Sequence, residues 1–221
     1  MPGRLRLPMY NPEHFECRDP GEIRRLIEEH PLGALVARGP QGLDANHLPF
    51  ELLPDAGPEG TLIGHVARAN PLWRELSDGD EVLVIFRAEE GYLSPNWYPS
   101  KHEAHRQVPT WNYRVVHVHG RVRVRDDERF VRGVVARLTR RHEARTGDPN
   151  PWKMGDAAPE YLDEMLARIV GIEIAIERIV AKCKLSQNKD ERDRLAAADA
   201  LDAHGGAALA RAMRDARPTP R

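Results

Sequence analysis

A strict alternation of apolar and basic side chains between Tyr113 and Arg125 constrains the fold of this chain more than any other sequence feature. The residues on one side of an extended segment are Val116, Val118, Val122 and Val124. Those on the other side are His117, His119, Arg121, Arg123 and Arg125. A period of two is that of a β-strand with two different faces, because a helix would mix these residues on its surface. We therefore expect the valines to lie in a core and the basic face to meet solvent or a ligand.

Further elements are predicted on both sides of this strand. The other predicted strands are 32–38, 43–53, 61–67, 81–86 and 169–182, with a Gly39–Gly42 turn that indicates a hairpin. The predicted helices begin after Asp19 and Asp126 and cover 161–166 and 191–214. Short strands with helices at the start, middle and end of the chain predict an α+β, mainly β fold centred on a β-barrel. The sequence contains neither G-x-G-x-x-G nor a P-loop pattern, which argues against a Rossmann site and a P-loop site.

Charge and hydropathy exclude several classes of protein. Lys and Arg number 33 and Asp and Glu number 34, so a uniformly basic nucleic-acid-coating protein is excluded. No segment approaches the roughly 18 consecutive apolar residues of a membrane-spanning helix. Residues 1–8 hold two arginines without the apolar stretch of a secretory signal, so we expect a cytoplasmic protein with no membrane partner. Cys17 and Cys183 are far apart and form no C-x-x-C motif, and we expect two buried or incidental thiols.

The first stretch that packing alone explains poorly follows the predicted strand 61–67. It begins at His65, and its Arg68 and Asn70 project to the same side of an extended chain. A guanidinium beside an amide is suited to clamp a phosphate or a carboxylate. The alternative is an arginine that pairs with a glutamate at the edge of the core.

A second stretch, residues 91–113, combines large aromatic side chains with prolines. Its candidate residues are Trp97, Tyr98, Lys101, Thr110, Trp111 and Asn112. Flat side chains with hydrogen-bonding groups around them favour the binding of a planar heterocycle. The alternative is an ordered loop whose tryptophans fill one end of the barrel.

A third stretch ends the last predicted strand. Lys182 and Lys184 project to one side, and Ser186, Gln187 and Asn188 follow with neutral donors and acceptors. This set is suited to an anionic polar ligand. The alternative is an exposed strand end followed by a helix cap at Ser186 or Asn188.

Two other patterns are less specific. The section Arg114–Arg145 contains ten arginines and four acidic residues, so it could steer a polyanion or form a solvated face. The pairs His117 with His119 and His102 with His105 lack further ligands nearby in the sequence, so we expect no metal site. No serine lies in a G-x-S-x-G motif, and no catalytic residue is assigned.

Several motifs together carry a resemblance to a known family. They are Met9-Tyr10-x-Pro12-x-His14-Phe15, His47-Leu48-Pro49-Phe50, Gly64–Trp73, Tyr92–Lys101, Val108–Tyr113 and Lys184–Asn188. In this order they resemble the PaiB-like family of FMN-binding negative transcriptional regulators. The resemblance implies a split β-barrel of the pyridoxine-phosphate-oxidase kind with peripheral helices. It also implies a homodimer that holds FMN in a groove where the two subunits meet.

The resemblance also assigns roles to residues and segments. Arg68 and Asn70 would contact the phosphate or the ribityl chain, and Thr110, Trp111 and Asn112 would line the flavin. Lys184, Ser186, Gln187 and Asn188 would close the site, and His65, Trp97 and Lys101 complete the candidate cofactor-binding residues. The expected domain is 1–195 with a helical insertion at about 126–167, followed by a helical or frayed tail at 196–221.

Three functions stay open at this point. The first is the negative transcriptional regulator that the resemblance implies, for which only the Arg114–Arg145 section supports DNA as a partner. The second is an FMN-dependent oxidoreductase that moves electrons from NADH or NADPH to a small acceptor. The third is a haem-binding protein that uses His117 or His119. The sequence leaves open whether the protein is an enzyme.

Overall fold

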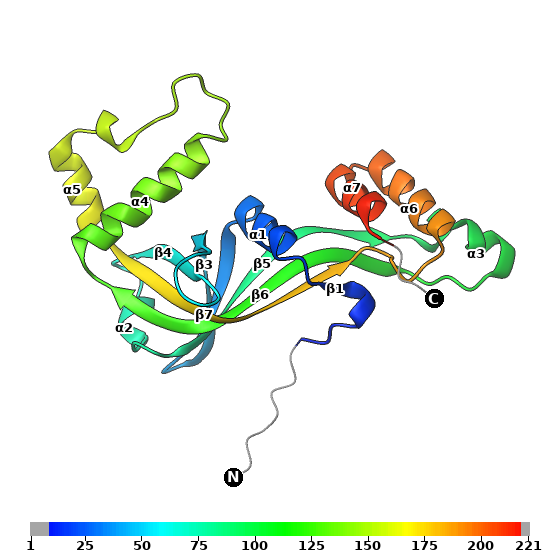
Figure 1. Ribbon diagram of the computed structural model, residues 1–221, viewed down its shortest axis with the longest axis horizontal. Coiled ribbons are helices and arrows are strands. Elements are labelled where there is room, and N and C mark those ends of the chain that lie inside the picture. Colours follow the sequence, from blue (N-terminus) through cyan, green and yellow to red (C-terminus); the bar gives the residue numbers. More distant parts are fainter. Residues whose placement is uncertain (1–8, 218–221) are drawn as a thin grey trace, which may run out of the picture. The chain divides into compact units, whose positions relative to one another are not determined.

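The computed structural model describes residues 9–217 of the chain (Figure 1). The strands are β1 (Glu16–Cys17), β2 (Leu32–Gly39), β3 (Gly42–Leu53), β4 (Thr61–Ala67), β5 (Glu81–Leu93), β6 (Thr110–Arg125) and β7 (Ile169–Lys184). The α-helices are α1 (Pro20–Glu29), α2 (Leu72–Glu75), α3 (Pro99–Ala104), α4 (Glu128–Glu143), α5 (Pro159–Ala167), α6 (Glu191–Ala203) and α7 (Ala207–Asp215). Residues 1–8, which bear on the expected absence of a secretory signal, lie outside the described residues, as does the end of the expected tail at 218–221.

The strands form one antiparallel sheet that closes on itself. Its order is β1-β7-β4-β3-β2-β5-β6, and β7 also pairs with β6, so the six strands from β2 to β7 make a ring. This closure confirms the predicted α+β split β-barrel with peripheral helices. Among the described residues, no helix is both long enough and apolar enough to span a bilayer.

The chain divides into two compact units, and the long strands β5, β6 and β7 run through both. The described part of unit 1 comprises residues 9–26, 87–116 and 180–217. Unit 2 comprises residues 27–86 and 117–179. The single domain expected at 1–195, its insertion and its tail stay predictions.

Unit 2 contains the predicted hairpin and the predicted central helix. Gly39 pairs with Gly42 across the β2–β3 turn, and Gly42 has a φ of 115°, which a residue with a side chain rarely adopts. The carboxylate of Asp127 accepts a hydrogen bond from the backbone N–H of Phe130 at 2.8 Å and so caps α4. Val134 and Leu138 of α4 pack with Ile63 in a buried cluster, which fixes α4 against the sheet.

The alternation in β6 is confirmed except at its end, where Val124 is only half-buried. Val116, Val118 and Val122 are buried, while Arg121 and Arg123 are exposed. The valine face therefore belongs to the core, as its period of two predicts.

In unit 1 the aromatic stretch is ordered, and it contains more regular structure than the sequence indicates. Strand β5 continues to Leu93, Pro95 begins a short 3-10 helix and Pro99 begins α3. Proline favours the first helical position because its fixed φ suits a helix and no N–H is needed there. The C-terminal segment forms α6 and α7, whose residues Leu201 and Leu209 lie next to Gly91 of β5.

Candidate functional site

The candidate residues are divided between the two units, and each group is described by itself. His65, Arg68 and Asn70 belong to unit 2. The candidates in unit 1 are Trp97, Lys101, Thr110, Trp111, Asn112, Lys184, Ser186, Gln187 and Asn188.

In unit 1, the structure brings Lys184 to the start of β6. Its Nζ donates hydrogen bonds to the Thr110 hydroxyl at 2.5 Å and to the Trp111 carbonyl oxygen at 2.6 Å. Both acceptors are neutral. Burial lowers the pKa of Lys184, and the positive charges of Lys182 and Lys189 lower it further.

Two lysines near Lys184 also have neutral hydrogen-bond partners. Lys182 donates to the Tyr10 carbonyl oxygen at 2.8 Å, and Lys189 donates to the Gln107 side-chain oxygen at 2.6 Å. Within residues 9–217, no carboxylate forms an ion pair with Lys182, Lys184 or Lys189. The lysine cluster, which we define as these three residues, therefore carries positive charge that the described chain does not neutralise by direct pairing.

Trp111, whose backbone carbonyl contacts the lysine cluster, has an exposed side chain. The Trp111 side chain is 54% exposed, and its backbone carbonyl is the acceptor for Lys184. The Tyr92 ring meets the Trp111 ring edge-on at 6.3 Å. An indole held from one side and open on another can stack on a planar ring.

Three other candidates form hydrogen bonds that stabilise the loop after β7. Asn112 is fully buried and donates to the Ser186 hydroxyl at 2.9 Å, and Ser186 has a left-handed backbone conformation with a φ of 66°. Gln187 donates to the Cys183 carbonyl oxygen at 2.6 Å and accepts from the Leu185 N–H at 2.7 Å. Asn112, Ser186 and Gln187 thus hold the loop in place, and Asn188 is exposed at its surface.

A buried polar network that sequence reasoning missed continues from Lys189. Asp193 is 1% exposed and accepts from the Ser100 hydroxyl at 2.5 Å and from the Gln107 amide at 3.1 Å. Gln107 accepts in turn from Lys189. No motif joins residues 100, 107 and 193, so the sequence offered no signal for this network.

The two candidates near α3 lie apart from these contacts. The Trp97 ring packs against the His204 ring at 5.2 Å between centroids, and a role of Trp97 in cofactor binding stays a prediction. Lys101 is half-buried in α3.

In unit 2, Arg68 has partners within the chain. Its guanidinium donates two hydrogen bonds to the Asp126 carboxylate, at 2.9 and 2.5 Å, and its Nε donates to the Ala167 carbonyl oxygen at 2.7 Å. The hydrogen bonds from Arg68, and to a smaller extent its charge, lower the pKa of Asp126. This arrangement matches the alternative of a paired arginine, with an aspartate in place of a glutamate. The role of Arg68 in cofactor binding stays a prediction.

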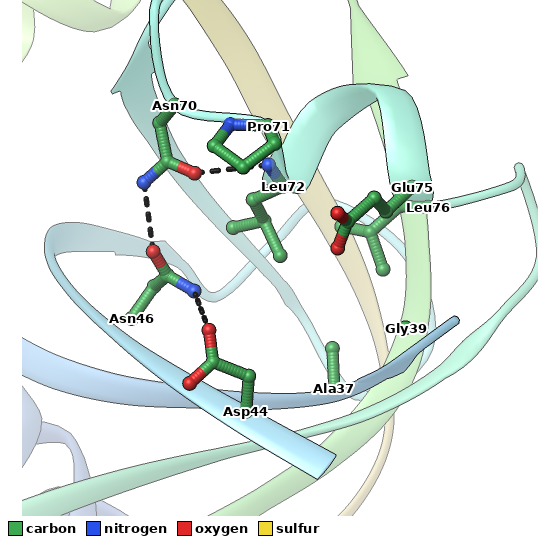
Figure 2. A pocket seen from close by; sticks show the side chains of 9 residues that line it. All are labelled: Ala37, Gly39, Asp44, Asn46, Asn70, Pro71, Leu72, Glu75 and Leu76. Atoms are coloured by element: carbon green, nitrogen blue, oxygen red, sulfur yellow. Dashed lines mark hydrogen bonds between the residues drawn. The ribbon is translucent and has the colours of Figure 1, made fainter. Parts of the chain in front are cut away.

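Asn70 lines a small pocket of unit 2, shown in Figure 2. Its side chain donates to the Asn46 oxygen at 2.7 Å and accepts from the Leu72 N–H at 2.9 Å, and Asn46 donates on to Asp44 at 3.4 Å. The cavity volume is about 30 Å³, which suits one or two water molecules. His65 lies on β4, its Nδ1 has no partner within the described chain, and burial lowers its pKa.

Comparison with known proteins identifies the family. The family model described as "Putative FMN-binding domain" matches residues 9–178. The chain belongs to this family. It is 32% identical over 187 residues to the Protease synthase and sporulation protein PAI 2 of Bacillus subtilis, covering 84% of this chain and 85% of the relative. It is 30% identical over 215 residues to an uncharacterized protein of Aspergillus fumigatus, covering 78% and 82% of the two chains.

Solved structures support the fold of this chain. A conserved hypothetical protein of Mycobacterium tuberculosis has a TM-score of 0.57 and 14% identity, covering 82% of this chain and 94% of that one. A FAD and haem binding protein of Mycobacterium smegmatis has a TM-score of 0.55 and 18% identity, covering 82% and 79%. At these identities the likeness concerns the fold alone.

Unit 2 also contains a larger, open pocket, which we call the hollow. Its volume is about 610 Å³, and its lining includes Ile63, Phe130, Arg129, Arg137 and Glu173. This volume is within the range of small-molecule pockets. No candidate cofactor residue lines the hollow. Its lining residues are spread between 53 and 173, so no single motif could have indicated it.

Most arginines of the section Arg114–Arg145 are paired with acidic residues, many of them from other parts of the chain. Seven of its ten arginines form ion pairs, namely Arg114, Arg121, Arg123, Arg125, Arg132, Arg137 and Arg141. The positive charge seen in the sequence is therefore mostly compensated in the fold, which weakens the case for a polyanion-binding face. His117 is half-buried, and burial, His119 and Arg178 all lower its pKa.

Proposed function

We propose that this protein binds FMN through unit 1, with the phosphate at the lysine cluster and the isoalloxazine ring against Trp111. The observation that carries the proposal is the set of neutral partners around Lys182, Lys184 and Lys189. An anion placed there would provide the countercharge that the described residues do not supply by direct pairing. The exposed indole of Trp111 offers a stacking face of the kind a flavin requires.

The chemistry of the donor set fits FMN rather than an uncharged flavin. A phosphate monoester carries close to two negative charges at neutral pH, and lysine amines bind it as point charges. When bound, the isoalloxazine ring supplies electron-transfer chemistry, and the protein supplies binding and orientation. Lys184 and Trp111 are the first residues we assign to this site, because Arg68 and Asn70 already have partners in the chain.

We propose further that the protein acts as a homodimer with FMN at the interface, as the resemblance to PaiB-like proteins implies. In support, unit 1 exposes large apolar side chains, among them Tyr10, Val108 and Trp111. Such side chains are typical of surfaces that a second chain covers. Light scattering on the full chain tests this, and a monomer at micromolar concentration that still binds FMN would contradict it.

For the biological role we propose negative regulation of transcription by the flavin-bound protein. The relation to the PAI 2 protein and the motifs shared with PaiB-like regulators support this role. We propose that the protein regulates transcription through contact with other proteins and not through direct contact with DNA. Seven arginines of the section Arg114–Arg145 are already paired with acidic residues, which leaves less free positive charge for DNA.

Two measurements on the purified protein test the proposal. The absorbance spectrum, or a titration of the flavin-free protein with FMN, should show one bound oxidised flavin per chain. Absence of flavin binding would refute the proposed cofactor. Steady-state NADH and NADPH oxidation then separates a regulator from an oxidoreductase, because rapid turnover with a small acceptor would replace the regulatory role by a catalytic one.

A further inference from the structure

The strongest unassigned feature of the molecule is a cluster of three potential metal ligands in unit 1. Cys17 of β1, Glu22 in the first turn of α1 and Cys183 of β7 place their ligand atoms within 4.8 Å of one another. Both thiols are buried and not in a disulfide. The sequence predicts two buried or incidental thiols, and their burial is confirmed, but the fold brings together two residues that lie far apart in the sequence.

Strand register explains why the two thiols meet. Cys17 pairs with Ala181 across the antiparallel β1–β7 ladder, and Cys183 lies two residues further along β7. Residues two apart on a strand point to the same face, so both thiols project from one side of the sheet. Lys182 and Lys184 occupy the alternate positions on β7, so their side chains leave the strand on the face opposite to the thiols.

We propose that Cys17, Cys183 and Glu22 bind a thiophilic divalent cation, Zn²⁺, with a water molecule as fourth ligand. Two thiolates and a carboxylate form a donor set that suits zinc, whereas magnesium and calcium prefer oxygen donors alone. Tetrahedral Zn²⁺ with sulfur ligands at about 2.3 Å places two such sulfurs about 3.8 Å apart. The ligand atoms of the cluster lie within 4.8 Å of one another, so they are close enough to share one cation.

The surrounding charges are compatible with such a site. Two thiolates, one carboxylate and Zn²⁺ sum to a single negative charge. Arg114 is buried 3.6 Å from Glu22 and shares its single positive charge between Glu22 and Glu89, so it offsets only part of that negative charge. Its shorter contacts, at 2.7 and 2.6 Å, are to Glu89, which leaves the Glu22 carboxylate able to turn towards the thiols.

Binding is an exchange of two protons for one cation. A free cysteine is mostly a protonated thiol at neutral pH, whereas the metal ligand is the thiolate. When Zn²⁺ binds, two S–H bonds break, two Zn–S bonds form and two protons leave to solvent. No oxidant is needed.

Register also favours this site over a disulfide. Diagonal positions on neighbouring strands have Cα atoms about 7 to 8 Å apart, whereas a disulfide requires about 4.4 to 6.8 Å. A bridging metal spans the longer separation. A disulfide between Cys17 and Cys183 is therefore an outcome that would count against the proposal.

The test uses the full chain, freed of metal with a chelator, kept reduced and titrated with Zn²⁺ against a chromophoric competitor. We expect one site per chain, release of two protons per Zn²⁺ and a higher melting temperature. Replacing Zn²⁺ with Co²⁺ should give thiolate-to-cobalt charge-transfer bands on the unmodified protein, so this readout does not depend on any variant folding.

Variants then assign the ligands. Cys17→Ser and Cys183→Ser should each weaken Zn²⁺ binding at least tenfold, and Glu22→Gln should weaken it while leaving both thiols in place. Glu13→Gln is the matched control, because Glu13 lies in the same segment and pairs with exposed Arg18. Undiminished Zn²⁺ binding by the doubly substituted Cys17→Ser/Cys183→Ser chain would overturn the proposal. So would Co²⁺ spectra without thiolate bands, or a reduced protein that binds no Zn²⁺ and forms a disulfide in air. None of these readouts involves flavin, so they are independent of the proposed FMN site.

Discussion

Replacing Lys184 with methionine is the sharpest test of the proposed FMN site. Methionine keeps an unbranched side chain of similar size and removes the charge. In the fold, the Lys184 amine is held by the Thr110 hydroxyl and the Trp111 carbonyl, so it is already positioned before a phosphate arrives. One charge-assisted hydrogen bond contributes about 1.5 to 3 kcal/mol. We therefore expect the dissociation constant for FMN to rise about 10- to 150-fold.

Riboflavin separates a phosphate contact from a general loss of the site. It has the same ring and ribityl chain without the phosphate. Fluorescence titration of the flavin-free protein should show that Lys184→Met weakens FMN binding strongly and riboflavin binding little. Lys153→Met, which changes an exposed lysine of unit 2, serves as the control. Equal weakening for both flavins, or unchanged FMN affinity, would refute the role we give to Lys184.

The pH dependence provides a second readout of the same contact. Burial and two neighbouring lysines lower the pKa of Lys184 in the free protein. Because only the charged amine attracts phosphate, the preference for FMN over riboflavin should decline as pH rises through this lowered pKa. The decline should begin at a lower pH than for an ordinary lysine, and Lys184→Met should lack this component.

Three further predictions concern the stability of unit 2, and thermal or denaturant unfolding measures each. Gly120→Ala should lower the free energy of unfolding by on the order of 1 to 3 kcal/mol, because its Cβ would overlap the Ala175 carbonyl oxygen, and an unchanged melting temperature would contradict this packing. Gly133→Ala in α4 should instead raise the free energy of unfolding by about 0.8 to 1 kcal/mol, since nothing lies within 4 Å of the added Cβ. Arg68 lowers the pKa of Asp126 below its usual value of 3.8. The charged carboxylate therefore contributes its full stabilisation above pH 3.8, and this contribution is lost as the pH falls through the lowered pKa. An Asp126→Asn variant should lack that acid-side loss, and an identical acid-unfolding curve would show that the pair contributes nothing.

Local signals in the sequence predicted most of the secondary structure. The cap at Asp19, the turn between Gly39 and Gly42 and the alternation in β6 each act within a few residues, and each is present in the fold. The aromatic stretch was harder to predict. Its short helices begin at Pro95 and Pro99, where a proline is equally typical of a loop, so the sequence alone could not distinguish them.

The candidate site was predicted in part, for a physical reason. The sequence identifies residue types that suit a phosphate or a flat ring, such as Lys184 and Trp111. It does not identify which cations the fold neutralises, because ion pairs join residues distant along the chain. Arg68 pairs with Asp126, whereas the described chain gives Lys184 only neutral partners.

The sequence by itself determined most of the longer strands and helices of this protein, because hydrophobic period, turn residues and helix caps act over a few neighbouring positions. It also carried the family motifs from Met9 onward. Only the tertiary structure decided how these elements combine, since closing the sheet through β6 and β7 is a long-range event. That closure and the β1–β7 register place Lys184 beside Trp111 and Cys17 beside Cys183, and no local pattern encodes either meeting.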